Sequence, residues 1–192
     1  MEDRTLLSAI GPAPELEWAT QFDGGSSYSF GISQDSSGNV YTVGYFSGTV
    51  DFDPGPGTHN LTSAGGRDVF VSKMTSEGQF EWASRIGAGA FDDSWGISVS
   101  NSGEVYLSGR FRETVDFDPG AGTQEITSNG GSDVFVLKLD AMGDFEWVHT
   151  MGGVDNENNY DLATDSLGNV IIAGNYSGTV DFEPGGWCYQ PC

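Results

Sequence analysis

The chain has 192 residues, of which seven are basic and 28 acidic, so its formal net charge is −21. Nucleic acid and anionic membrane surfaces are excluded as main partners, because both are bound through clustered Lys and Arg side chains. No stretch approaches the roughly 18 apolar residues of a membrane-spanning helix, so membrane insertion is not expected. Hydrophobic residues make up 37% of the chain and aromatic residues 12%, which is enough for a packed core.

The first 14 residues precede the regular part of the sequence, and we expect residues 1–14 to be an N-terminal leader or linker. Residues 1–10 lack the hydrophobic core of a secretory signal peptide, so no signal peptide is visible in this sequence.

A 65-residue repeat organises the rest of the chain. The hexapeptide Val-Asp-Phe-Asp-Pro-Gly begins at Val50 and again at Val115, and Val-Asp-Phe-Glu-Pro-Gly begins at Val180. Gly-Gly-x-Asp-Val-Phe-Val recurs at the same spacing. Such self-similarity predicts tandem structural units. We assign them to residues 15–79, 80–144 and, as a partial unit, 145–185, followed by an off-pattern tail at 186–192.

Within each repeat the apolar residues alternate with a period of two, which predicts strands. The first repeat is expected to contain strands at 29–34, 40–46, 68–74 and 79–86, with a short extension at 49–53. The sequence Asp-Ser-Ser-Gly-Asn at 35–39 predicts a tight hairpin turn, because its Asp can accept bonds from the backbone ahead and its Gly can adopt a positive φ.

Four main strands and a short extra hairpin per repeat are typical of a β-propeller blade. The sequence shows no convincing helical pattern. The expected fold class is therefore all-β, with about two and a half propeller-type blades of antiparallel strands.

The residues of the repeat resemble the bacterial β-propeller repeat family abbreviated SBBP. The matching pattern is Asp-x-x-Gly-Asn-Val-Tyr, then Gly-x-Phe, then Gly-Gly-x-Asp-Val-Phe-Val-x-Lys. In the first repeat it is carried by Asp35, Gly38, Asn39, Val40, Tyr41, Gly44, Phe46, Gly65, Gly66, Asp68, Val69, Phe70 and Lys73. The second repeat departs from it at Ser100 and Glu104, and the third stops before its Gly-Gly-x-Asp strand.

This resemblance covers roughly residues 15–185 and implies a secreted or cell-surface β-propeller without assigned catalytic residues. A second, short resemblance concerns Glu-Asp-Arg-Thr-Leu-Leu-Ser at 2–8. It is similar to a Leu-Glu-x-Arg-x-Leu-Leu segment near the start of some large bacterial exported proteins.

The number of repeats leaves the assembly open. Propellers usually close with four to eight blades, and terminal units would expose apolar surface and strand edges. The chain can be a piece of a longer reading frame, can associate with copies of itself, or can form a short open stack. The off-pattern tail at 186–192 favours a fragment of a longer propeller. Two incidental thiols or a local disulfide are both compatible with Cys188 and Cys192 in this tail.

Large aromatic residues recur at two repeat positions, and we expect them to belong to the core, with a ligand platform as the alternative. One position holds Trp18, Trp82 and Trp147, and the other holds Phe30, Trp95 and Tyr160.

Paired acidic residues precede each Pro-Gly turn. Residues two apart on a strand share a face, and carboxylates in Gly-rich loops can bind calcium, although a turn-capping or solvated role is the favoured interpretation. The calcium candidates are Asp51, Asp53, Asp116, Asp118, Asp181 and Glu183. Asp68 and Asp133, after Gly-Gly, are predicted to cap turns. Four further acids, in loops expected to join consecutive sheets, are candidates for specificity: Asp92, Asp93, Asp155 and Glu157.

Motifs for zinc proteases, serine hydrolases, P-loop proteins and dinucleotide-binding proteins are absent from the sequence, so no catalytic or cofactor-binding residue is assigned. We expect a non-enzymatic β-propeller repeat module of an exported or cell-surface bacterial protein, which binds protein or glycan or serves as a scaffold. The alternatives are a calcium-dependent adhesion module and a carboxylate-based glycan-cleaving enzyme.

Overall fold

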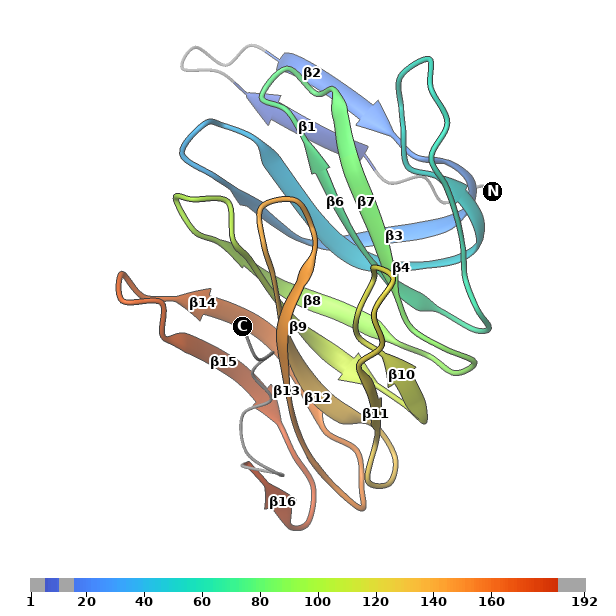
Figure 1. The fold of residues 1–192 in the computed structure, drawn as a ribbon, viewed down its shortest axis with the longest axis vertical. Helices are drawn as coiled ribbons and strands as arrows, with labels where there is room; N and C mark the ends of the chain where they lie inside the picture. The colour runs from blue at the N-terminus through green and yellow to red at the C-terminus, as the bar shows by residue number, and fades with distance from the viewer. Residues whose placement is uncertain (1–5, 11–15, 183–192) are drawn as a thin grey trace.

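A computed structural model describes residues 6–10 and 16–182, and this part of the chain is built from β-strands joined by turns (Figure 1). The described residues include no helix, and all sheet pairings between named strands are antiparallel. The predicted all-β class with antiparallel strands is therefore confirmed. No membrane-spanning helix is found among the described residues.

Two complete sheets have the same strand order. Sheet I consists of β3 (Asp23–Gln34), β4 (Val40–Asp51), β6 (Asp68–Met74) and β7 (Phe80–Ile86), paired in that order. Sheet II consists of β8 (Asp93–Val99), β9 (Val105–Phe111), β12 (Asp133–Leu139) and β13 (Phe145–Gly153), again in that order. We call the first two strands of each sheet, β3 and β4 or β8 and β9, its inner pair. The last two, β6 and β7 or β12 and β13, are its outer pair. The predicted repeat boundary at 79/80 falls inside sheet I, because β7 pairs with β6.

Short strands form at the Val-Asp-Phe segments. β5 (Asn60–Thr62) pairs with the end of β4. One repeat later the equivalent segments form a separate two-stranded sheet of β10 (Thr114–Asp116) and β11 (Glu125–Thr127).

Two half-sheets lie at the ends of the described chain. The N-terminal pair consists of β1 (Leu6–Ile10) and β2 (Leu16–Gln21). Sheet III consists of β14 (Asn158–Thr164) and β15 (Val170–Asn175), while β16 (Val180–Asp181) pairs with the end of β13. β1 lies in the segment that the sequence assigned to a leader or linker, so the regular structure begins earlier than predicted.

The predicted hairpin turn forms as expected. Asp35 accepts hydrogen bonds through Oδ1 from the backbone N–H groups of Ser37 and Asn39, at 2.8 and 3.0 Å. Gly38 has a φ of 83°, which an L side chain would resist. The same carboxylate-to-backbone bonds recur in the turns that begin at Asp140 and Asp165. A side chain at the start of each turn thus fixes the register of the hairpin.

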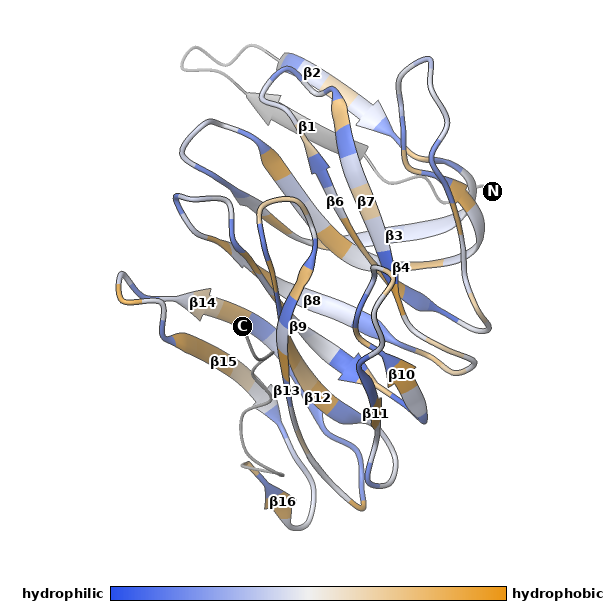
Figure 2. Ribbon diagram, in the orientation of Figure 1, coloured by the Kyte–Doolittle hydropathy of each residue, from blue (hydrophilic) through white to orange (hydrophobic). Residues whose placement is uncertain are grey.

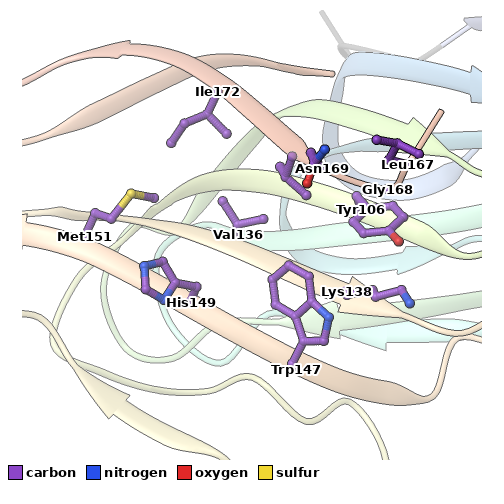
Figure 3. Close-up of a pocket in the computed structure, with 11 residues that line it drawn as sticks. Tyr106, Val136, Lys138, Trp147, His149, Met151, Leu167, Gly168, Asn169 and Ile172 are labelled. Atoms are coloured by element: carbon purple, nitrogen blue, oxygen red, sulfur yellow. The ribbon is translucent and has the colours of Figure 1, made fainter. Parts of the chain in front are cut away.

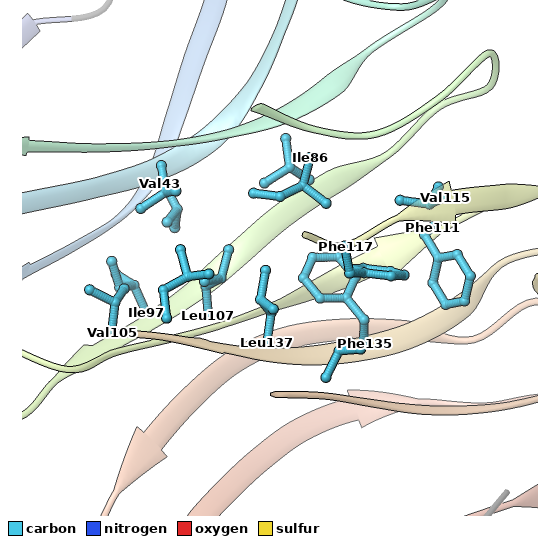
Figure 4. Close-up of a cluster of buried hydrophobic side chains, with 14 of the residues drawn as sticks. Val43, Ile86, Ile97, Val105, Leu107, Phe111, Val115, Phe117, Phe135 and Leu137 are labelled. Carbon is cyan, nitrogen blue, oxygen red and sulfur yellow. The ribbon is translucent and has the colours of Figure 1, made fainter. Parts of the chain in front are cut away.

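The hydrophobic core lies between successive sheets, because each sheet has apolar side chains on both faces. Val43 and Val71 of sheet I pack with Leu107 and Leu137 of sheet II in one buried cluster (Figure 4). The opposite face of sheet I, including Phe70, forms a second cluster with Trp18 of the N-terminal pair packed against it. A third cluster joins sheet II to sheet III. The sheets are therefore stacked face to face, with β8 in contact with both β3 and β14.

The Val-Asp-Phe segments anchor their hairpins in this core. Phe117 is fully buried, with its ring centroid 5.1 Å from that of Phe111 and 5.2 Å from that of Phe135. Phe182 occupies the same repeat position but is 57% exposed. The same residue type in the same motif therefore makes very different contributions to stability.

We expect Phe117→Ala to lower the free energy of unfolding by about 3–5 kcal/mol, because it leaves a cavity among buried rings. Phe182→Ala is the matched control and should cost less than about 1 kcal/mol, as is usual at exposed positions. Urea unfolding followed by circular dichroism measures both values. Similar losses for the two variants would contradict this account of the core.

Candidate functional site

The paired acids of the Val-Asp-Phe segments hold their own loops. Asp51 Oδ1 accepts hydrogen bonds from the backbone N–H groups of Asp53 and His59, at 3.1 and 2.8 Å. Asp53 Oδ1 accepts one from the Gly55 N–H at 2.8 Å. Asp116 and Asp118 repeat this pattern in the second repeat. These carboxylates therefore close the loops by accepting backbone bonds, which is the structural alternative that the sequence left open.

The calcium prediction for these residues remains a prediction. Among the described residues, no group of three or more His, Cys, Asp or Glu side chains is placed so that it could hold a metal ion. Asp181 is exposed at the end of β16, and Glu183 lies outside the described residues.

The loop-closing role of these acids can be separated from metal binding. We expect Asp116→Ala to lower the free energy of unfolding by about 1–3 kcal/mol, because two backbone N–H groups lose a charged acceptor. The loss should be the same in calcium and in a chelator. A loss that appears only in calcium would show that the carboxylate acts through a bound ion, since a ligand that binds only the folded state raises its stability.

The second set of repeated aromatic residues lies at β-bulges on the inner strands. The pairing of β3 with β4 shifts between Ser29 and Gly31, which leaves Phe30 as the extra residue. An equivalent register shift leaves Trp95 as the extra residue in β8 and Tyr160 as the extra residue in β14. A bulge turns the extra side chain out of the regular ladder. Phe30 is 49% exposed and Tyr160 is 61% exposed, so the prediction that these two residues belong to the core was wrong.

Glycine opposite each bulge explains why the bulge recurs. A Cβ atom on Gly44 would lie 1.8 Å from the carbonyl oxygen of Tyr28. The equivalent positions, Gly109 and Gly174, would bring a Cβ to 2.0 and 2.2 Å from a backbone oxygen of the facing strand. Only glycine permits this close approach.

The prediction that the recurring aromatic residues belong to the core does hold for the Trp position, where Trp18, Trp82 and Trp147 pack against buried clusters.

The bulge residues form what we call the aromatic row: Phe30, Trp95 and Tyr160. β8, which carries Trp95, lies beside both β3 and β14. The ring centroids of Phe30 and Trp95 are 6.3 Å apart, and Phe30 is 5.5 Å from Tyr45. The row therefore crosses three sheets and offers ring surface to solvent at each step.

Arginine side chains cover part of this aromatic surface. The guanidinium of Arg67 lies 4.4 Å from the ring centroid of Tyr45 and 5.4 Å from that of Phe91. The guanidinium of Arg110 lies 5.1 Å from the centroid of Trp95. Stacked cation–π pairs of this kind hold an arginine in place while its N–H groups stay available. The sequence has only seven Lys and Arg residues, so this surface concentrates positive charge in a very acidic chain.

Buried carboxylates lie beneath the arginines. Asp93, which is fully buried, accepts hydrogen bonds through Oδ2 from Arg110 Nε and Nη2 at 3.1 and 2.8 Å. Arg67 Nη1 lies 3.9 Å from the other oxygen of Asp93. Arg85 Nη1 donates to Asp68 Oδ2 at 2.6 Å. These ion pairs orient the arginines from below.

Asp92 and its neighbours act as internal caps. Asp92 accepts backbone N–H bonds from Ala88 and Arg112, at 2.9 and 3.0 Å, and Glu157 accepts one from Gly153 at 3.0 Å. Asp68 and Asp133 cap the loops before their strands, as predicted. The expectation that Asp92, Asp93 and Glu157 form an accessible specificity loop was wrong, because all three are buried. Asp155 alone of that set is exposed.

Burial raises the pKa of Asp92 to about 6, against its backbone hydrogen bonds and with help from the charges of Asp68 and Asp93. Burial also raises the pKa of Asp133, and the nearby charge of Glu157 adds to the effect. The folded state therefore holds protons on these carboxyls over a pH range in which the unfolded chain releases them.

This difference predicts how stability changes with pH. The folded-state pKa of Asp92 lies above its usual 3.8, so its contribution to stability falls as the pH rises from about 4 to 7. Relative to Asp92→Asn, the wild-type protein should lose stability over this window, by at most about 3 kcal/mol. Urea unfolding at several pH values measures the difference, and Asp155→Asn is the exposed control. Parallel pH profiles for wild type and Asp92→Asn would contradict the assignment.

The aromatic and arginine surface was only partly visible in the sequence. The sequence shows the recurrence of Phe30, Trp95 and Tyr160, but recurrence alone does not distinguish a buried ring from one at a bulge. The facing glycines Gly44 and Gly109 were the available signal. Arg67 and Phe91 meet through a bridge between segments of different sheets, which no local pattern predicts.

Comparison with known proteins gives weak relationships. No family model matches the sequence. An uncharacterized WD repeat-containing protein of Acanthamoeba polyphaga mimivirus is 28% identical over 118 residues, which cover 54% of this chain and 8% of that protein. Regulatory protein FlaEY of Caulobacter vibrioides is 26% identical over 160 residues, which cover 79% of this chain and 16% of that protein. The chain thus spans a small part of both relatives, and the first of them supports a repeat module of β type.

Proposed function

We propose that this chain is a non-enzymatic binding module built of β-propeller-type blades. Its sheets are stacked face to face, and each runs from an inner to an outer pair of strands. Propellers of WD repeats consist of four-stranded sheets of this kind, and one relative carries WD repeats in its name. The resemblance to the SBBP repeat supports the same architecture, and from it we infer an exported or cell-surface bacterial location.

The observation that carries the binding function is the exposed aromatic row. Phe30 and Tyr160 expose their rings at one recurring position of the fold, and exposed apolar surface of this kind marks interaction sites. The apolar face of a sugar ring can pack on an aromatic ring, and the spacing of 6.3 Å between Phe30 and Trp95 suits an extended chain of rings. We therefore propose a glycan as the ligand.

The arginines indicate the charge of that glycan. The side chain of Arg67 is 45% exposed, and its guanidinium is held between two rings. An exposed, oriented guanidinium is suited to a carboxylate or sulfate, which it binds in a bidentate manner. Asp92 and Asp93, which lie beneath the arginines, are buried and already accept hydrogen bonds. This arrangement supports the binding of an acidic glycan and gives no reason to assign cleavage.

A glycan array that includes neutral and acidic polysaccharides, among them polygalacturonate and alginate, tests the proposal. We expect binding of an acidic glycan, measured by isothermal titration calorimetry. Phe30→Ala and Tyr160→Ala should each weaken it about 2- to 10-fold, through loss of ring contacts. Arg67→Gln should weaken it and reduce its salt dependence.

Met142→Ala is the matched control, because Met142 is 72% exposed in a turn and does not belong to the row. Its affinity should equal that of the wild type. Equal affinity in all of these variants would remove the aromatic row as the binding surface, and the absence of any glycan ligand would remove the proposed function.

A further inference from the structure

The N-terminal pair corresponds to an outer pair of strands, and no described strand serves as its inner pair. β1 pairs with β2 in the register Leu7↔Thr20 and Ala9↔Trp18, followed by a shift before Ile10. β6 and β7 show the same register, Val71↔Ser84 and Lys73↔Trp82, with the shift before Met74. β12 and β13 repeat the pattern with the shift before Leu139. The N-terminal pair is therefore equivalent to the outer half of sheets I and II.

Sheet III is the complementary half. β14 pairs with β15 with the same bulge that is found between β3 and β4 and between β8 and β9. In sheets I and II the second inner strand pairs on its other edge with an outer strand. Within the described residues, β15 pairs only with β14. One end of the described chain thus carries the strands that the other end lacks.

The missing outer strands leave apolar side chains in contact with solvent. Ile171 is 61% exposed, whereas Tyr41 and Tyr106, at the same repeat position, are 0% and 6% exposed. Tyr176 is also 61% exposed, whereas Phe46 and Phe111 are fully buried. Figure 2 shows the apolar residues along β15, at the margin of the molecule. In sheets I and II these positions are covered by the outer pair of the same sheet and by a sheet packed on the same face. Within the described residues, sheet III has no outer pair and no sheet following it.

A pocket marks the place that the outer pair would occupy. It has a volume of about 530 Å³ and lies between sheet II and sheet III, lined by Val136, Trp147 and Met151 among others (Figure 3). The equivalent residues of sheet I, including Val71, Trp82 and Ile86, belong to or pack against the cluster formed with β12 and β13. In sheet I the surface is filled by the next outer pair, and in sheet II it is open.

We propose that the N-terminal pair of a second copy of this chain occupies this pocket and completes sheet III. The pairing within sheets I and II fixes the register of the proposed contact. Tyr41 pairs with Lys73 and Tyr106 pairs with Lys138. Ile171 and Ala9 occupy the equivalent positions, so Ile171 should pair with Ala9 of the second copy. Strand alternation places positions 6, 8 and 10 on the face opposite Trp18, and hence toward the pocket. Leu6 and Ile10 stand at the register positions of Phe70 and Met74, which are buried in sheet I.

The number of copies follows from the proposed propeller arrangement, on which this inference rests. For a chain of residues 1–192, the described residues contribute sheets I and II and, at each junction, one sheet shared with the neighbouring copy. One copy closed on itself would give three sheets, two copies give six and three give nine. Propellers close with about four to eight blades. A head-to-tail contact must close to avoid forming a filament, so two copies are the expected assembly.

Light scattering on the chain of residues 1–192 tests the assembly directly. We expect a molar mass about twice 20.4 kDa. Ser8→Arg should yield a monomer, because Ser72, which occupies the same register position in sheet I, is buried and a long charged side chain there would not be accommodated. Ser8→Ala should remain a dimer. Matching circular dichroism and urea midpoints for the dissociated Ser8→Arg chain and a diluted Ser8→Ala chain would exclude unfolding as the cause.

Crosslinking tests the register. In a background with Cys188→Ser and Cys192→Ser, a chain with Ile171→Cys is mixed with a chain with Ala9→Cys and oxidised. Opposite residues in a ladder have Cα atoms about 4.5–5.5 Å apart, which a disulfide spans, so a covalent dimer should form. Ser8→Cys in place of Ala9→Cys is the control, and it should crosslink poorly because its side chain lies on the other face.

A monomer at all concentrations, an open-ended polymer, or equal crosslinking of positions 8 and 9 would overturn the inference. These results would leave the glycan proposal intact, because the aromatic row lies within a single copy. Conversely, if Phe30→Ala or Tyr160→Ala abolishes glycan binding and leaves the dimer unchanged, the result bears on the binding surface and not on the assembly.

Discussion

Both faces of each complete sheet in this protein are apolar, so no sheet can be buried without a neighbour on either side. In sheet I, Phe70 and Met74 point to one face and Val69 and Val71 to the other, and all four are buried. Hydrogen bonds satisfy the strands only within the plane of the sheet. The free energy of folding must therefore come from the contact between sheets, as in other repeat proteins, whose stability is a sum of units and of interfaces. The exposed side chains of sheet III show the cost of a missing neighbour.

The same stacking of sheets explains how a recurring β-bulge produces the candidate binding surface. Inner strands of successive sheets lie side by side, and β3, β8 and β14 share a bulge at the same repeat position. The bulge needs a glycine opposite and turns one side chain outward. Because the bulge recurs, so does the outward side chain, and an aromatic residue stands there in every repeat. Scaffold and aromatic row therefore have a single origin.

The sequence predicted what depends on local pattern. The period of two located the strands, and the Asp and Gly of the turn 35–39 located a hairpin that the backbone bonds confirm. It did not predict β1, because five residues carry too little periodicity to be recognised as a strand. It placed Phe30 and Tyr160 in the core, because burial at a bulge depends on the pairing register and not on residue type. The arginine contacts across sheets were beyond any local argument.

The repeats differ in the arginine side chains that lie near the buried aspartates. Arg67 and Phe91 of the first repeat correspond to Ser132 and Asn156 of the second, and Arg85 corresponds to Thr150. Asp68 and Asp133, by contrast, are shared and buried alike. A buried carboxylate must be paired or neutralised. Asp68 has Arg85 as its partner, whereas the pKa of Asp133 is raised, as expected for a carboxyl that burial and Glu157 drive toward its neutral form. The repeated acids thus belong to the fold, and Arg67 and Arg85, which have no arginine counterpart in the second repeat, give the junction of sheets I and II arginines that the other junction lacks at the same positions.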